Sequence, residues 1–484
     1  MSPKSHGSNI ERAFRANTHT GRRVTNPSRL ATARAPEGIP PMTLRFTSRS
    51  FRILTAVVML VGLLGSPAAP AHAAPGNAVT DWNAIAVSTL IALPGPAGGA
   101  PPAAQIHMGM VQGAVYDAVN ATEPEHYRPY LLNRRFGARA SREAAVATAA
   151  YGVLSSIVAT VPAMTPEARA SVLQTLAGHY TNYLAVIPDS PFKRQGIAAG
   201  TAAADAMIAA RQNDGRFGPS PWVSNAAPGH WQPLLNAAGQ PNLDLTPWVG
   251  NVTPFLLQSS SQFRTAGPQS LTSAAWAADF NEVKSLGSVS SSVRTPKQTH
   301  IALWWQSTPV RTWNEVARNL VSDPAYGVSL ADSARLFAMQ NLSAADAAIN
   351  CWNDKYHYDF WRPWNAIPRA AEDGNPATEP DPTWTALITA PYPSHPSGHL
   401  CLDGAHLGVM ETFFGTDAIA FGATSAPFPG EVRFFSSFSQ ALDEIVEARI
   451  WAGLHYRTAD VQGRGLGENV AAFAVANYFQ RVGH

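Results

Sequence analysis

The sequence has 484 residues, of which 45% are hydrophobic and only 14% are charged. This length and hydrophobic content suit a large buried core, and the low charge excludes a charge-solvated disordered chain and a coiled coil. The formal net charge of +2 is unevenly distributed: residues 1–73 carry ten basic and two acidic residues, and the rest carries 25 basic and 31 acidic ones. Because the basic excess lies in the N-terminal segment, the composition does not favour nucleic-acid binding.

The N-terminal segment ends in the pattern of a secretion signal. Three arginines precede an apolar run, residues 53–64, which leads to a small-x-small site ending at Ala73. These are the features of a signal peptide, and about a dozen apolar residues are too few to span a bilayer. We therefore predict a leader over residues 1–73, with cleavage before Ala74 and translation starting at Met42. The remaining chain is expected to be secreted, with no transmembrane anchor.

The next part of the chain is predicted to form alanine-rich helices. Apolar residues recur at helical spacing in four stretches, and Ser141 and Thr165-Pro166 have the side chains expected at helix N-termini. The four predicted helices cover residues 103–120, 141–161, 166–187 and 191–211.

Helical periodicity disappears near residue 213 and resumes near residue 271. Between these points Gly, Pro, Asn and Trp punctuate the chain, which predicts a long irregular segment with a short hairpin, packed over helices. From residue 271 a helical pattern continues, with breaks, to Val482, and strand signals are few. We therefore predict an all-α protein with a helical region over 74–212, an irregular segment over 213–270 and a second helical region over 271–484.

The first of three polar clusters is KYHYDFWRP, residues 355–363, which continues a helix expected to begin near Ser343. Lys355 and Arg362 are seven residues apart, about two helical turns, so both side chains are expected on one helical face. Two cations on an otherwise aromatic face are costly to bury unless an anion lies between them. The cluster therefore predicts either an anion site or two cations that reach solvent along the surface.

The second cluster is Pro396-Ser397-Gly398-His399, followed by an apolar helical stretch. Ser397 stands where a helix N-cap is expected and Gly398 opens the first turn, where free backbone N–H groups and the helix dipole attract anions. His399 would lie beside such an anion as a proton donor or acceptor. An ordinary N-cap followed by a histidine with satisfied hydrogen bonds would show the same pattern.

The third cluster contains Arg449, His455 and Asp460. Gly453 is expected to bend the chain so that His455 faces the same side as Arg449, and the Asp460 carboxylate would orient the histidine ring. Arginine, histidine and aspartate are common near helix ends, so this cluster indicates a site only in combination with the other two.

Together, the three clusters resemble the signature of the superfamily of type 2 phosphatidic acid phosphatases and vanadium-dependent haloperoxidases. That signature reads Lys-six residues-Arg-Pro, then Pro-Ser-Gly-His, then Ser-Arg-five residues-His-three residues-Asp. Residues 355–363 and 396–399 match the first two parts in full. In the third part Ala448 replaces the serine, and the aspartate comes one residue late, at Asp460. Upstream stretches (QIHMGMVQGAVYDAVN and DAAINCWNDKY) also look like the soluble, exported bacterial haloperoxidase branch.

The resemblance implies helical bundles of the vanadium haloperoxidase and acid phosphatase type, with the oxyanion bound in the region 271–484. In such a site His455 would bind vanadium or attack phosphorus, and His399 would act as the acid–base group. The residues that would surround the oxygens of vanadate or phosphate are Lys355, Arg362, Ser397, Gly398, Arg449 and Asp460.

The activity implied by the resemblance is a vanadate-dependent peroxidase. It would oxidise halide with hydrogen peroxide to a hypohalous-acid equivalent for a small organic acceptor, and the family's bundles often pair as homodimers. The same residues would also suit a soluble exported acid phosphatase that acts on phosphomonoesters through a phosphohistidine, and the altered third motif leaves a catalytically silent relative as another alternative. Tyr392, five residues before Ser397, leaves the halide undecided.

The two cysteines of the chain, Cys351 and Cys401, lie next to the first two clusters. Because Lys355 and Ser397 must converge on one anion, the helix segments that carry the cysteines are expected to lie close together. In an exported protein this predicts a disulfide, worth on the order of 4 kcal/mol in the chain-entropy model. Two buried free thiols are the alternative.

Overall fold

Helices make up most of residues 77–123 and 127–483, which are the residues that the computed structural model describes. The predicted leader, with Met42 and the cleavage site before Ala74, lies outside these residues. The α-helices of the described part are α1 (Ala78–Ile91), α2 (Pro101–Asn120), α3 (Arg142–Thr160), α4 (Pro166–Ala185), α5 (Pro191–Ala210), α6 (Ala274–Leu286), α7 (Pro296–Trp304), α8 (Pro309–Ser322), α9 (Leu330–Tyr358), α10 (Pro363–Ala366), α11 (Gly398–Phe414), α12 (Phe438–Trp451) and α13 (Arg457–Asn477).

The four helices predicted before residue 212 are present as α2 to α5, with ends within two residues of the prediction. Two of the predicted N-terminal signals act as caps. The Ser141 side chain accepts a hydrogen bond from the Ala144 N–H, and the Thr165 side chain accepts one from the Ala168 N–H. Each cap satisfies a backbone donor that the helix itself leaves free.

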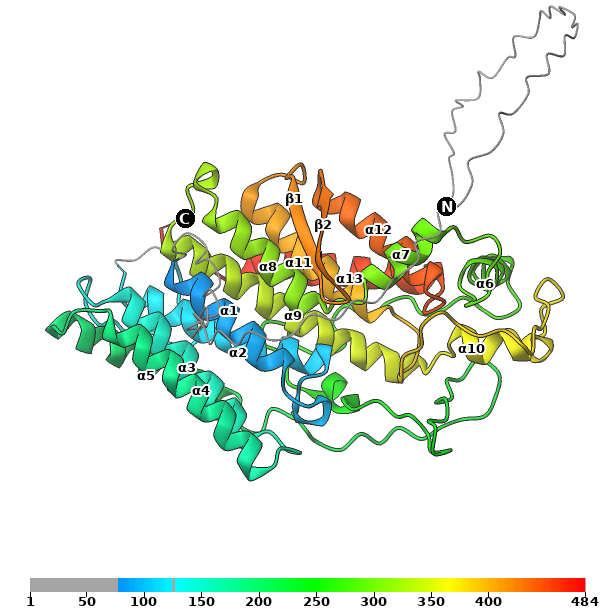
Figure 1. The fold of residues 1–484 in the computed structure, drawn as a ribbon, viewed down its shortest axis with the longest axis horizontal. Helices are drawn as coiled ribbons and strands as arrows, with labels where there is room; N and C mark the ends of the chain where they lie inside the picture. The colour runs from blue at the N-terminus through cyan, green and yellow to red at the C-terminus, as the bar shows by residue number, and fades with distance from the viewer. Residues whose placement is uncertain (1–76, 124–126, 484) are drawn as a thin grey trace, which may run out of the picture. The chain divides into compact units, whose positions relative to one another are not determined.

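Helices α2 and α9 pack against each other and connect two groups of helices (Figure 1). On one side α2 packs with α3 and α5, and α4 lies outside α3 with only Leu176 buried. On the other side α9 packs with α11 and α13, which also form a close pair. One continuous hydrophobic core runs through both groups, so the described residues form a single compact unit. The predicted all-α class is confirmed.

Helix α9 is longer at its start and shorter at its end than the sequence suggested. It begins at Leu330, where the Ser329 side chain accepts from the Asp332 N–H, and not near Ser343, which is buried inside the helix. It ends at Tyr358 because Asp359 adopts a left-handed conformation, with φ 49°. The prediction that Lys355 and Arg362 share one helical face is therefore wrong, because the chain leaves the helix between them.

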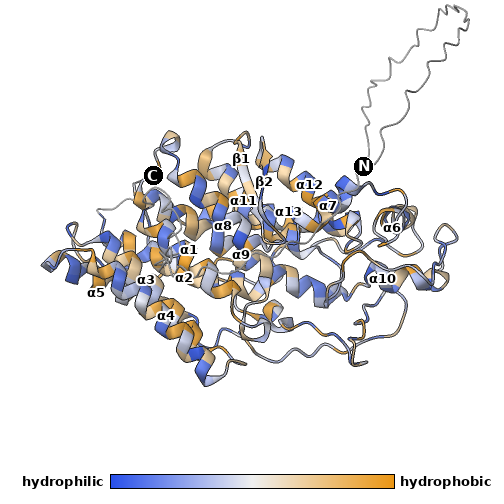
Figure 2. Cartoon of the chain, in the orientation of Figure 1, coloured by the Kyte–Doolittle hydropathy of each residue, from blue (hydrophilic) through white to orange (hydrophobic). Residues whose placement is uncertain are grey.

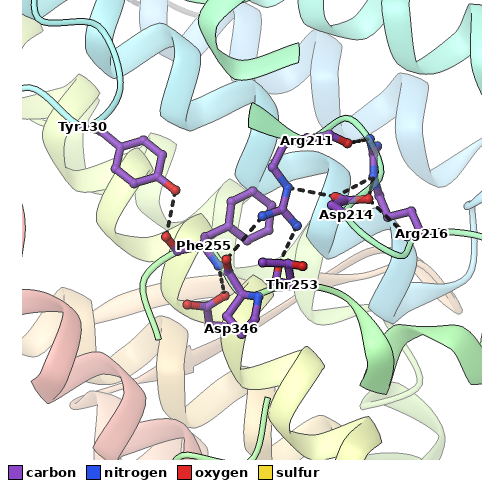
Figure 3. A network of polar contacts seen from close by, with 8 residues as sticks. Tyr130, Arg211, Asp214, Arg216, Thr253, Phe255 and Asp346 are labelled. Carbon is purple, nitrogen blue, oxygen red and sulfur yellow. Dashed lines mark hydrogen bonds and ion pairs between the residues drawn. The ribbon is translucent and has the colours of Figure 1, made fainter. Parts of the chain in front are cut away.

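The predicted irregular segment, residues 213–270, contains only the short 3₁₀ helix η2 (Pro247–Asn251) and isolated bridges. The expected short hairpin is present around the bridge between Leu235 and Pro241, where the Asn236 N–H donates to the Gln240 carbonyl and the Asn242 N–H to the Leu234 carbonyl. Figure 3 shows how the start of the segment is held. Arg211, just after α5, donates to the Asp214 carboxylate at 2.8 Å and to the Thr253 carbonyl at 2.7 Å.

Side chains from one stripe of α9 satisfy the backbone of the same segment. The Asp346 carboxylate accepts hydrogen bonds of 2.7–2.8 Å from three consecutive N–H groups, those of residues 255–257. Figure 3 shows Asp346 beside the first of them, Phe255. Further along the helix, the Asn350 side chain accepts from the Phe263 N–H, the Asn353 amide donates to the Gly250 carbonyl, and Asp354 accepts from the Thr265 N–H. These four residues, the α9 stripe, replace the neighbouring strand that an extended chain normally needs.

Two short strands interrupt the helices of the last region, where the sequence suggested helix with breaks. Strands β1 (Phe421–Ser425) and β2 (Phe428–Phe435) form an antiparallel hairpin. Burial alternates along β1, the period of two that marks a half-buried strand, but five residues are too few to stand out against the surrounding helical pattern.

Helix α3 is the one described helix long and apolar enough to cross a membrane by length and composition. Its apolar window is 61% buried within the structure, as in the core helix of a water-exposed bundle. Hydrophobic and hydrophilic residues are mixed along the neighbouring helices α4 and α5 (Figure 2).

Candidate functional site

The three polar clusters of the sequence converge on one buried region between the ends of α9, α11, α12 and α13. The second cluster is tied to the third by a hydrogen bond of 2.9 Å from the Ser397 N–H to the Ala459 carbonyl. The first is tied to the second because the Lys355 ammonium donates to the Pro396 carbonyl. The residues that the structure brings together, hereafter the anion site, are Lys355, Arg362, Ser397, Gly398, His399, Arg449, His455 and Asp460.

Lys355, in the last turn of α9, is fully buried and bound by carbonyl groups. Its Nζ donates to the Pro393 carbonyl at 3.0 Å and to the Ser394 carbonyl at 3.3 Å, in addition to that of Pro396. The Tyr392 ring centroid lies 5.2 Å from the same Nζ. Burial, with a smaller contribution from the nearby Arg362, lowers the pKa of Lys355 to about 8. The lysine remains mainly protonated at neutral pH, although it pairs with no carboxylate among the described residues.

Arg362, just before α10, is fully buried with one nitrogen unused. Its Nε donates to the Tyr392 carbonyl at 2.9 Å and its Nη1 to the Leu454 carbonyl at 2.6 Å. Its Nη2 is buried and has no hydrogen-bond partner among the described residues. Burial lowers the pKa of Arg362 to about 10, so the guanidinium stays charged. A buried charged donor without an acceptor is unfavourable unless a ligand provides one.

Arg449, in the last turn of α12, repeats this arrangement. Its Nη1 donates to the Trp305 carbonyl at 3.0 Å, while its buried Nε has no partner in the described part of the chain. Burial lowers the pKa of Arg449, and the carboxyl groups of Asp460 and Asp403 oppose that shift.

Ser397 and Gly398 form the N-terminus of α11 as predicted, but the serine hydroxyl does not cap it. The Ser397 Oγ is buried and makes no side-chain cap hydrogen bond. A Cβ on Gly398 would lie 3.1 Å from the Trp352 ring and 3.6 Å from Lys355 Cε, so glycine allows these groups to pack against the first turn. The helix end therefore presents a free hydroxyl and free backbone N–H groups to the same region as the three cations.

His455 lies in the bend between α12 and α13, where Gly453 has φ 71°. Its Nε2 is 3.2 Å from Arg362 Nη1, which is a donor, and its Nδ1 is 3.4 Å from the Ser394 Oγ. Burial and three nearby cations lower the pKa of His455 well below its usual value, so the ring is neutral. Because Nε2 faces a donor, it carries the lone pair, and Nδ1 carries the proton.

His399, in the first turn of α11, is the half-buried histidine of the site. Its Nε2 lies 3.4 Å from the Ser307 carbonyl, which can only accept, so this nitrogen carries the proton. Burial and the Arg449 charge lower the pKa of His399 well below its usual value.

Asp460, in the first turn of α13, is fully buried and makes no hydrogen bond with His455, although the sequence suggested that it orients that ring. Its two oxygens have no partner of normal geometry among the described residues, but it faces the Ser397 hydroxyl. Burial raises the pKa of Asp460 well above its usual value, and Ser397 and Arg449 oppose this shift. Asp460 thus lies behind Ser397 and Arg449, while Ser394 and Arg362 contact the histidine.

The predicted disulfide is absent, and that prediction is wrong for this structure. Cys351 and Cys401 are both buried free thiols. They do lie close together. Burial raises the pKa of Cys401, and a hydrogen bond with the neighbouring Cys351 raises it further. The Cys351 Sγ is 3.9 Å from the Pro396 carbonyl oxygen. Convergence of the motifs brought the thiols near each other but does not determine whether they are oxidised to a bond.

Comparison with known proteins shows which families have similar sequences and folds. Residues 335–483, which include the whole anion site, match the family described as the VCPO second helical-bundle domain. Among curated proteins, vanadium chloroperoxidase of Curvularia inaequalis is 27% identical over 200 residues, which are 35% of this chain and 32% of that protein. Both matches support the resemblance of the region that holds the anion site to the superfamily of vanadium-dependent haloperoxidases and type 2 phosphatidic acid phosphatases.

Solved structures show that the superfamily resemblance extends to the fold of most of the chain. A bacterial vanadium-dependent iodoperoxidase superposes with a TM-score of 0.67 at 21% identity, covering 85% of this chain and 100% of that one. A bacterial vanadium-dependent chloroperoxidase in its holo form gives 0.61 at 16% identity, covering 80% and 93%. The sequence match to the curated relative spans about a third of that protein's length.

Several groups that shape the anion site carry no signal in the sequence. The acceptors for Lys355, Arg362 and Arg449 are backbone carbonyls, which any residue type could provide. Ser394, which contacts His455, precedes the second cluster by only two residues, and its position there was the one available hint.

Proposed function

We propose that the chain is a vanadium-dependent haloperoxidase that oxidises halide with hydrogen peroxide. The observation that carries this proposal is the set of buried donors without acceptors, namely Arg362 Nη2, Arg449 Nε and the Ser397 hydroxyl. They come from three different elements, and the cations among them form no ion pair with a carboxylate of the described residues. Such donors fit a ligand with several negatively charged oxygens, as vanadate has.

The residues present fit vanadate in number and type. Lys355, Arg362 and Arg449 supply positive charge, and the α11 N-terminus with Ser397 and Gly398 supplies neutral donors. His455 is neutral and its Nε2 lone pair can bind the metal directly, while its other nitrogen donates toward Ser394. Bound vanadate would supply a Lewis-acid centre that activates hydrogen peroxide.

His399 is the residue suited to move protons at this site. It is half-buried, so it can exchange a proton with solvent, and its ring lies close enough to Arg449 for that charge to lower its pKa. Burial is the larger cause of the lowered pKa, and a bound oxyanion would oppose the smaller part that comes from the Arg449 charge. The anion would thus make protonation of His399 easier, as an acid–base role requires.

The names of similar proteins favour the peroxidase over a phosphatase, since the curated relative is a chloroperoxidase and the two solved structures are an iodoperoxidase and a chloroperoxidase. In the same proposal the protein acts outside the cytoplasm after its leader is removed. The acceptor of the oxidised halide is a small organic molecule.

The test supplies purified protein with orthovanadate, hydrogen peroxide and bromide, chloride or iodide, and follows halogenation of a dye. Vanadate-dependent halogenation supports the proposal, and His455→Ala is expected to abolish it because vanadium loses its protein ligand. Full activity of that variant would exclude the role given to His455. Hydrolysis of a phosphate ester without vanadate, with no halogenation in its presence, would show an acid phosphatase instead. A protein inactive in both assays would be a silent relative.

A second variant separates binding from proton transfer. His399→Ala is expected to retain vanadate, measured by equilibrium dialysis, while turnover falls by about 10²–10⁴-fold, the usual loss of an acid–base group. Weakened vanadate binding with unchanged turnover at saturation would contradict the role given to His399.

A further inference from the structure

A buried carboxyl group that is not part of the three motifs lies one helical turn beyond His399. Asp403 is on α11, four residues after His399, so both side chains lie on the same face of the helix. It is only 2% exposed, although it belongs to the apolar stretch LCLDGAHLG. An aspartate is rarely buried in such surroundings without a partner for each oxygen.

Only one oxygen of Asp403 has such a partner. Its Oδ1 accepts a hydrogen bond of 2.6 Å from the indole Nε1 of Trp313 on α8. Its Oδ2 is buried without a partner among the described residues. The Trp313 ring packs against that of Trp305, whose carbonyl accepts from Arg449. Asp403 is therefore linked to Arg449 through the Trp313 and Trp305 side chains and the Trp305 carbonyl.

The charged groups around Asp403 come from few elements. Arg449 on α12 is the cation that acts on its carboxyl group, and Asp403 in turn acts on Arg449. On its own helix, His399 and His406 are neutral, because burial lowers the pKa of each. Helices α9 and α13, which also pack against α11, bring no charge from the described residues that shifts Asp403.

We propose that Asp403 is a positioning residue of the anion site, which acts through Arg449 and whose ionisation sets how tightly the site binds an oxyanion. The proposal rests on the proposed function only in requiring that the anion site binds an oxyanion. When Asp403 is ionised, its negative charge offsets that of Arg449 and repels the ligand. When it is protonated, the full charge of Arg449 is available to the oxygens.

The direction of the pH effect follows from the surroundings of the carboxyl group. Burial raises the pKa of Asp403 to about 7, and the hydrogen bond from Trp313 and the charge of Arg449 oppose this shift. Above that pH the group is mainly ionised and oxyanion binding is weakened, whereas below it the group is neutral and binding is strengthened.

The experiment measures the affinity for inorganic phosphate by calorimetry in the wild type and in Asp403→Asn. Asparagine keeps an acceptor for Trp313 but carries no charge. Because phosphate also titrates, the quantity compared is the ratio of the two affinities at each pH, in which the ligand's own ionisation cancels. The ratio is expected to be near one at about pH 5.5 and to favour Asp403→Asn by about tenfold at about pH 8.5, as for one unit charge roughly 10 Å from the ligand at an effective dielectric of about 20.

Two further variants serve as controls for this experiment. Trp313→Phe removes the donor to Asp403 Oδ1, so the ionised form of Asp403 loses stabilisation and its pKa should rise. In the Trp313→Phe background, the pH at which Asp403→Asn begins to raise the phosphate affinity is therefore expected to be higher. Asp205→Asn, at an exposed position of α5, should give a ratio of one throughout. A ratio for Asp403→Asn that does not change with pH would overturn this proposal while leaving oxyanion binding intact. Failure of the wild type to bind either phosphate or orthovanadate would overturn both proposals.

Discussion

Two buried polar centres of this molecule differ in whether their polar atoms have partners. In the centre around Asp346 (Figure 3), each carboxylate oxygen accepts backbone N–H groups, and the neighbouring Arg211 donates to a carboxylate and to two carbonyls. In the anion site, Arg362, Arg449 and Ser397 each keep a buried donor that nothing in the described chain accepts from.

This difference distinguishes the Asp346 centre, which stabilises the fold, from the anion site, whose donors are suited to bind a ligand. Folding normally leaves few buried donors without acceptors, because each unsatisfied group costs about 1–3 kcal/mol. The Asp346 centre obeys this rule and attaches the irregular segment to α9. The anion site departs from it three times within one small region, which predicts opposite responses of the two centres to mutation and to ligand.

The largest effect is expected from breaking the satisfied centre. Asp346→Ala leaves three consecutive N–H groups without acceptors, so the free energy of unfolding should fall by about 3 kcal/mol or more. Urea unfolding followed by circular dichroism measures this loss. Asp205→Ala, which removes an exposed aspartate, is the matched control and should change stability by less than about 0.5 kcal/mol. Equal losses in the two variants would contradict the role given to Asp346.

Breaking the unsatisfied centre should leave the fold nearly unchanged. Arg449→Met removes a buried cation and replaces it with an apolar side chain of similar length, so the unfolding free energy without ligand should be unchanged or higher. Phosphate affinity should fall by about tenfold to hundredfold, because a hydrogen bond to a charged group is lost. A marked loss of stability together with unchanged phosphate affinity would show that Arg449 is structural.

A ligand should stabilise the protein through the anion site alone. Phosphate at about one hundred times its dissociation constant should raise the unfolding free energy by about 2.7 kcal/mol, and it should compete with vanadate. Asp346→Ala, if it folds, should gain the same unfolding free energy from phosphate, starting from its lower stability without ligand. Arg449→Met should gain little unfolding free energy at the same phosphate concentration. Thermal unfolding with and without phosphate measures this, and vanadate loading that is insensitive to phosphate would refute a shared site.

The smallest effect concerns the charge of Lys355. Because burial lowers its pKa to about 8, the lysine is protonated below that pH and begins to lose its charge above it. The bound anion raises the pKa, so the advantage of the wild type over Lys355→Met in phosphate affinity should decline as the pH rises from about 8. Calorimetry at several pH values checks the decline. An advantage that stays constant to about pH 10 would mean that Lys355 never loses its proton in this range.

The helices before residue 212 could be predicted to within two residues because their signals are local. A serine or threonine cap followed by apolar residues at helical spacing determines both start and face. The start of α9 could not be predicted in this way, because Ser343 looks like a cap but is buried within the helix, and the actual cap is Ser329. Only packing against α2 and α11 distinguishes the two.

The residues of the anion site could be predicted because charges in apolar surroundings are conspicuous in the sequence, as with Lys355 and Arg449. Their partners could not, since most are backbone carbonyls. Asp403 is just as conspicuous in its helix, yet its relation to Arg449 depends on how α11 packs against α12. For the cysteines, the sequence indicated that they are close, but closeness does not determine a bond.

The α9 stripe also has a consequence for how relatives of this protein can diverge. Because Asp346, Asn350, Asn353 and Asp354 satisfy backbone groups between residues 250 and 265, the side chains at these anchored positions are free of that task. Substitutions between the anchored positions should be tolerated wherever the stripe is kept. Insertions there should be tolerated too, since doubling the length of a flexible loop costs only about 0.6 kcal/mol. The segment is thus where new surface features can evolve without disturbing the helices beneath it.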